Sequence, residues 1–134
     1  MDLRQAAVED TTRVELTDAT GNPLKDSAGN QPAIVIYGPG SKEYTSAVAA
    51  RNNRMMDRLR KKGKSDLSSD QQVSDHATFL AACTHSFEYI ERDNLTDLAL
   101  FKATYSDPRI GFIVEQVAAK LGDWANFTLT VQEP

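Results

Sequence analysis

The spacing of apolar residues changes abruptly at Gly38-Pro39-Gly40. Upstream, RVELTD (13–18) alternates apolar and polar residues, which is typical of a half-buried strand. AIVIYG (33–38) is a continuous run rich in β-branched residues, which is typical of a buried strand. Downstream, apolar residues recur three and four positions apart, as in a helix. The sequence therefore predicts an α+β fold, in which an N-terminal β-hairpin precedes a mostly α-helical region of about four helices.

The predicted hairpin region covers residues 13–38 and follows a loose N-terminal arm, residues 1–12. Its two strands are joined by DATGNPLKDSAGNQP (18–32), a connection rich in the turn-forming residues Gly, Asn, Asp and Pro. Because an isolated two-stranded hairpin is only marginally stable in water, we expect this one to pack on helices or on the sheet of another copy. An uncovered strand edge would also invite pairing with another copy.

The helical region covers residues 41–127 and is divided by residues that commonly begin or end helices. At a helix start, a Ser or Asp side chain accepts a hydrogen bond from a free backbone N–H. Ser41 is the residue expected to do so at the first predicted helix. These signals predict helices over 41–62, 69–91, 96–105 and 107–121. An aromatic turn (123–127) and the tail TLTVQEP (128–134) follow, and we interpret the tail as a last strand or a mobile end.

Specific helix-end signals support this division. Ser69 and Gln72 have the spacing of a capping box, and Asp107-Pro108 combines a capping carboxylate with proline at the first helical position. Gly63 and Gly122 stand where a left-handed residue often ends a helix. The helix predicted over 69–91 is expected to be the most buried, because apolar residues lie on more than one of its faces. Its main apolar stripe consists of Val73, Ala77, Leu80, Cys83 and Phe87.

Length and composition limit the classes of protein to which the chain can belong. Its 134 residues suit a single domain, and 40% hydrophobic and 25% charged residues are ordinary for a globular protein. A net charge of −4 argues against nucleic acid as the main partner, because phosphate binding depends on a positive field. The single cysteine excludes an intrachain disulfide, and no apolar run approaches the roughly 20 residues of a membrane helix. The N-terminus is too polar for a signal peptide. We therefore expect a cytoplasmic protein.

A basic stripe runs along the first predicted helix. Three interpretations of it remain open: a solvated helix end whose cations complement the helix dipole, a docking face for an acidic protein, or a nucleic-acid contact. The stripe lies beside an apolar seam of Tyr44, Val48, Met55 and Leu59. Spacings of three and four residues place its members on one side of the helix, and they are Arg51, Arg54, Arg58 and Lys61.

The residues that most often carry catalysis or bind metals have structural explanations here. YGPGSK (37–42) lacks the spacing of a phosphate-binding loop and predicts a turn between strand and helix. His76 and Cys83 lie two helical turns apart, and His85 lies roughly 160° around the predicted helix from Cys83, so we expect no metal site and a buried thiol. We therefore expect neither enzymatic activity nor a cofactor. Helix capping and stabilisation of the helix dipole explain most of the aspartates at predicted helix starts, which are Asp66, Asp70, Asp75, Asp93, Asp97 and Asp107.

Two aromatic residues close the helical region. Trp124 and Phe127 either cap the core or anchor a partner, because aromatic residues dominate binding hot spots. The order of segments is also distinctive: a hairpin region, a helix that ends in RLRKKGK (58–64), then ATFLAACTHSFEYI (77–90) and DPRIGFIVEQVAAKLGDWANF (107–127). This order resembles the tail assembly chaperones of long-tailed, siphovirus-type bacteriophages, over roughly residues 13–127.

The resemblance implies a binding protein rather than an enzyme. Such chaperones bind the tape-measure protein and recruit tail-tube subunits in the host cell cytoplasm, and they are absent from the mature virion. The resemblance also implies a homo-oligomer and no cofactor. We therefore predict protein partners at the basic stripe and at the aromatic turn. The residues concerned are Arg51, Arg54, Arg58, Lys61, Trp124 and Phe127.

Two other functions remain alternatives. One is a small nucleic-acid-binding regulator that uses the basic helix, residues 41–62, and the other is a structural head–tail component of the virion. A gel-shift titration across salt concentration tests the first alternative, and the protein content of purified particles tests the second.

Overall fold

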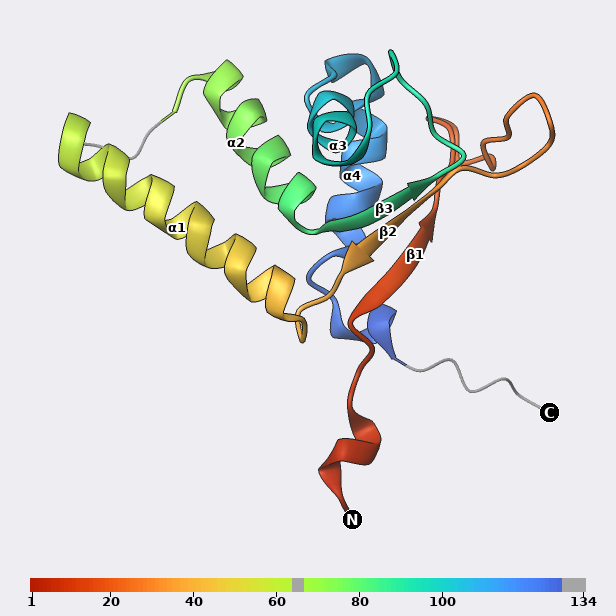
Figure 1. The fold of residues 1–134 in the computed structure, drawn as a ribbon, viewed down its shortest axis with the longest axis horizontal. Helices are drawn as coiled ribbons and strands as arrows, with labels where there is room; N and C mark the ends of the chain where they lie inside the picture. Colours follow the sequence, from red (N-terminus) through yellow and green to blue (C-terminus); the bar gives the residue numbers. More distant parts are fainter. Residues whose placement is uncertain (64–66, 129–134) are drawn as a thin grey trace.

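The computed structural model describes residues 1–63 and 67–128 of the chain (Figure 1). Its strands are β1 (Thr11–Glu15), β2 (Ala33–Tyr37) and β3 (Thr84–Glu88). Its α-helices are α1 (Lys42–Lys62), α2 (Ser69–Ala82), α3 (Asp97–Tyr105) and α4 (Gly111–Lys120). Short 3-10 helices lie at η1 (Leu3–Ala6), η2 (Pro108–Ile110) and η3 (Trp124–Phe127). The predicted α+β class is confirmed, and the N-terminal strands pair as expected.

The three strands form an antiparallel sheet in the order β1-β2-β3. Val14 and Phe87 both lie opposite Ile34, so the three side chains share the face that packs against the helices. On the other face, the Arg13 guanidinium reaches across β2 and pairs with Glu88 at 2.8 Å. One apolar and one charged face are expected of an antiparallel sheet that is covered on one side.

The helices are arranged in two groups (Figure 1). α1 and α2 run side by side away from the sheet, whereas α3 contacts β3 and α4 contacts β1. α2 packs against both α1 and α3, so it connects the two groups. The hairpin therefore packs on helices, as expected.

The core lies where the sheet meets α2, α3 and α4. Burial of one large apolar side chain contributes about 1.5–3 kcal/mol, so these contacts dominate the stability of the fold. The Thr84 hydroxyl is also buried here, and it donates to the Leu80 carbonyl at 2.8 Å. The Tyr105 hydroxyl lies 2.7 Å from Thr84 Oγ1 and donates to it, because the single proton of Thr84 is already used. The most deeply buried apolar side chains include Ile34, Ile36, Leu80, Cys83, Val117 and Phe127.

The prediction of one long helix over 69–91 is wrong. α2 ends at Ala82, and the chain continues as β3, which pairs with β2. Thr, His, Ser and Phe at 84–87 have weak helix propensity, so little is lost when these residues leave the helix. The side of β2 that faces away from β1 needs hydrogen-bond partners, and β3 supplies them. The predicted marginal hairpin is thereby extended to three strands.

Most helix-end signals are confirmed. Ser41 Oγ accepts from the Tyr44 N–H at 3.1 Å, and Gly63 is left-handed with φ 72°. The capping box of α2 lies one residue earlier than predicted, at Ser68 and Gln71. Asp107 caps as predicted, but the turn that follows it is the 3-10 helix η2, and α4 begins at Gly111. Gly122 does not adopt the predicted left-handed conformation.

The predicted boundaries at the chain ends shift slightly. The N-terminal arm, predicted over 1–12, contains η1, and its last two residues belong to β1. Of the predicted tail, residues 128–134, only Thr128 lies within the described residues.

Candidate functional site

The predicted basic stripe joins α1 to α2. Arg54 Nε lies 2.7 Å from Asp75 Oδ1, and Arg58 Nη1 lies 3.6 Å from the same oxygen. The Asp75 side chain is only 18% exposed. Two guanidiniums thus share one carboxylate, and Arg54 Nη2 and Arg58 Nε are buried without a hydrogen-bond partner among the described residues. These two arginines mainly hold the helices together.

The other two members of the stripe differ in their surroundings. The Arg51 guanidinium carbon lies 4.0 Å from the centre of the Phe79 ring on α2, a cation–π contact worth about 0.5–2 kcal/mol. Lys61 is exposed near the end of α1. The stripe therefore does not form one free basic surface: three arginines face α2, and Lys61 faces solvent.

A cavity of about 460 Å³ lies where α1 meets α2, and its lining includes Arg51, Val73 and His76. A second cavity, of about 290 Å³, lies between α2 and α4, and its lining includes Val73, His76, Val114 and Ala118. The two cavities share Val73 and His76, which lie between them on α2. We call the surface formed by these two adjoining cavities the Val73 trough, with α2 at its centre, Arg51 of α1 on one side and α4 on the other.

The trough presents apolar surface to solvent. Val73 is 46% exposed, although the sequence pattern places it on the buried stripe of α2. On α1, Met55 and Leu59 follow Arg51 by four and eight residues and are each 39% exposed, beside the cavities rather than in their lining. Apolar side chains exposed in or beside a cavity are candidates for contact with a partner.

The surroundings of His76 favour its uncharged form. Its pKa is lowered first by burial and then by the positive charge of Arg51, and Asp75 offsets this only in part. An uncharged imidazole keeps the floor of the trough compatible with an apolar partner. Protonation at acidic pH would place a second cation beside Arg51.

The predicted absence of a Cys–His pair rests on a wrong helix. His85 lies on β3, where its ring packs edge-on against Tyr37 with 5.5 Å between ring centroids. The predicted angular separation of His85 and Cys83 assumed one continuous helix, so it does not apply to this structure. Cys83 ends α2 and is fully buried, as predicted, and burial raises the pKa of its thiol to about 12. Within 1–63 and 67–128, no cluster of three or more potential metal ligands occurs.

The two closing aromatic residues differ in exposure. Phe127 is 1% exposed, and its ring packs so closely against Gly38 that an added Cβ would overlap a ring carbon. Phe127 therefore caps the core and presents no surface to a partner. Trp124 is 56% exposed, while one edge of its ring lies near Gly40.

The YGPGSK segment forms a tight turn, as predicted. Ser41 is buried, and its hydroxyl donates to the Gly38 carbonyl at 2.7 Å. Ser41 Oγ also accepts a hydrogen bond from the Tyr44 N–H and so caps α1. The serine is thus engaged in holding the turn and the helix start together.

Val73, His76 and Val114 were not predicted as site residues. The apolar period of α2 and α4 was visible, but the period does not show which apolar residues a neighbouring helix leaves uncovered. Searches against family models, curated proteins and solved structures find no match for this chain. Among the helices of the described part of the chain, none combines the length and apolar character needed to cross a membrane.

Proposed function

We propose that the chain is a tail assembly chaperone of a long-tailed bacteriophage. It acts in the cytoplasm of the host cell, where it binds the tape-measure protein and recruits tail-tube subunits. It works by binding rather than by catalysis, needs no cofactor, self-associates and is left out of the mature virion. The order of segments over residues 13–127 supports this proposal, and the Val73 trough is the observation that carries it.

The trough suits a helical client. A partner helix lays apolar residues spaced three and four apart into a groove between helices. α1 has 21 residues and is therefore about 30 Å long, and Arg51 near its middle is the α1 residue that lines the trough, so a client helix bound there would follow α1 over part of its length. A long helical client holds many such segments, and several copies bound along it would gain from multivalency.

The positions chosen to test client binding must leave the fold intact. Arg54 and Arg58 hold α1 against α2, so their charge reversal would disturb the fold as well as a client contact. Val73 and Met55 are exposed and make no such ion pair. Leu98, which is 62% exposed on α3, provides a matched apolar control outside the trough.

The experiment is co-purification of the tagged chain with the tape-measure protein of its phage. We expect Val73→Asp and Met55→Ser each to weaken retention at least about tenfold, because loss of one central apolar contact costs about 1.4 kcal/mol or more. Leu98→Ser should retain the client. Circular dichroism confirms that each variant is folded. Full retention by folded Val73→Asp and Met55→Ser would contradict the proposal.

Lys61 and Trp124 remain candidates for contact with tail-tube subunits or with another copy, because both are exposed. Lys61→Glu and Trp124→Ala should then leave client retention unchanged and weaken tube recruitment or self-association. The same preparations can be titrated with DNA and RNA at low salt. A gel shift with DNA or RNA that Lys61→Glu abolishes would favour the nucleic-acid alternative instead.

A further inference from the structure

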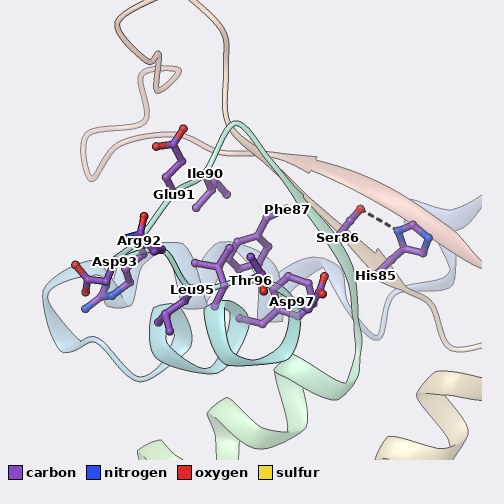
Figure 2. Close-up of a pocket in the computed structure, with 13 residues that line it drawn as sticks. His85, Ser86, Phe87, Ile90, Glu91, Arg92, Asp93, Leu95, Thr96 and Asp97 are labelled. Carbon is purple, nitrogen blue, oxygen red and sulfur yellow. Dashed lines mark hydrogen bonds between the residues drawn. The ribbon is translucent and has the colours of Figure 1, made fainter.

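A third cavity, of about 820 Å³, lies between β3 and the segment that joins it to α3, residues 89–96 (Figure 2). Figure 2 shows β3 on one side, this segment on the other and α3 below. The Phe87 ring packs on Phe101 with 4.6 Å between ring centroids, which fixes the apolar floor. The apolar lining consists of Phe87, Ile90, Leu95, Leu100 and Phe101. We call this cavity the β3 groove.

The backbone of β3 is open toward this groove. The Leu16 N–H bonds to Pro32 on one side of β2, and the Gly38 N–H bonds to Asp10 on the same side. The backbone N–H and C=O groups of successive residues point to opposite sides of a strand. Ile34 and Ile36 therefore also bond toward β1, whereas residues 33 and 35 bond toward β3. Their partners are residues 88 and 86. The N–H and C=O of Phe87, which lies between them, therefore point away from β2 and into the groove.

The opposite edge of the sheet is covered just beyond each end of β1. The Gln116 side chain on α4 accepts from the Thr17 N–H at 3.0 Å and donates to the Thr17 carbonyl at 2.9 Å. At the other end of β1, the Glu9 N–H donates to the Phe127 carbonyl at 2.7 Å. For Phe87, no backbone or side-chain bond on the groove side occurs within the described residues. An open strand edge is the feature to which an added strand binds.

The far wall of the groove has a defined shape. Three of the four non-glycine residues with positive φ in the described chain, Asp93, Asn94 and Asp97, line it, and the fourth, Tyr89, directly follows β3. Left-handed backbone in residues other than glycine persists only where the surroundings hold it, and it concentrates at binding sites. The Arg92 guanidinium ties this wall to Asp107 at 2.9 Å, so the groove is largely formed before anything binds.

The rim of the groove is acidic. Glu91, Asp93 and Asp97 are exposed along it, whereas the single guanidinium of the lining, Arg92, is engaged by Asp107. An unpaired strand edge, an apolar floor and unbalanced carboxylates thus lie together. A strand that pairs with Phe87 would point alternate side chains to opposite sides.

We propose that the β3 groove binds an extended basic segment of a partner protein as a fourth strand beside β3. The segment pairs with the Phe87 backbone, places apolar side chains on the Phe87–Phe101 floor and presents lysine or arginine to Glu91, Asp93 and Asp97. The groove involves neither α1 nor α4, so this site is separate from the Val73 trough. It stands whether or not the tape-measure protein is the client.

The test begins with random octapeptides displayed on phage and selected against the full chain. Enriched sequences should alternate apolar and basic residues, and no enrichment, or enrichment of acidic peptides, would overturn the proposal. The best peptide is then bound to the ¹⁵N-labelled chain. The Phe87 amide should exchange freely without peptide and at least about tenfold more slowly with it. A Phe87 amide unchanged by a bound peptide would also overturn the proposal.

Two controls separate strand addition from other modes of binding. N-methylation of the peptide at the residue that pairs with Phe87 should abolish binding, whereas methylation of the next residue should not. Glu91→Gln with Asp93→Asn should weaken the peptide about threefold to tenfold, while the matched pair Glu9→Gln with Asp57→Asn should have no effect.

The variant Val73→Asp should bind the peptide like the wild type, which keeps this test independent of client binding. Protection of the Phe87 amide that rises with protein concentration in the absence of peptide would assign the edge to a second copy, and that result would overturn the proposal.

Discussion

Replacing Asp75 with asparagine removes the carboxylate that Arg54 and Arg58 share between α1 and α2. A hydrogen bond between charged groups contributes about 1.5–3 kcal/mol, and loss of one partner of a fully buried pair costs about 3–5 kcal/mol. The Arg54 and Arg58 side chains are 32% and 21% exposed, so water offsets part of this cost. We therefore expect Asp75→Asn to lower the free energy of unfolding by about 2 kcal/mol.

Urea unfolding followed by circular dichroism measures this change by linear extrapolation. The control is Asp57→Asn, because the 3.6 Å contact between Asp57 and Arg60 joins side chains that are 60% and 74% exposed. That loss should stay below about 0.5 kcal/mol. Adding Arg54→Met to Asp75→Asn should restore part of the stability, because it removes a cation left without its partner. If Asp75→Asn is as stable as the wild type, this ion cluster does not hold α1 on α2 and the reasoning is refuted.

Three further predictions concern single residues. Gly38→Ala should cost about 1–3 kcal/mol in urea unfolding, because its Cβ would overlap the Phe127 ring, whereas Gly111→Ala meets no atom within 4 Å and should cost nothing. The folded-state pKa of His76 lies below its unfolded value near 6.5, so the unfolded chain takes up this proton first as the pH falls. The wild type should therefore lose stability relative to His76→Gln as the pH drops from 7 through 6, and parallel pH profiles would contradict this. Cys83 should resist iodoacetamide at pH 8 in the folded chain and react readily in urea, because burial raises its thiol pKa to about 12; equal rates would contradict a buried thiol.

Local signals predicted those parts of the fold that depend on neighbours in the sequence. The change of period at residues 38–40 separates β2 from α1, and Ser41 and Gly63 define the ends of α1. These features depend on backbone conformation and on hydrogen bonds within a few residues, which sequence patterns record directly. The buried state of Cys83 was predictable for a different reason, because it lies in an apolar run of the sequence.

The tertiary structure alone decided which surfaces stay uncovered. Residues 84–88 form a strand because β2 has a free side to pair with, and no pattern within the segment states this. Arg54 and Arg58 share a side of α1 in any helix, but only the packing of α2 brings Asp75 to them. Val73 is apolar and stays exposed because α1 and α4 leave a trough above it. Periodicity fixes which residues share a face, whereas long-range packing fixes what covers that face, and binding sites arise where that cover is incomplete.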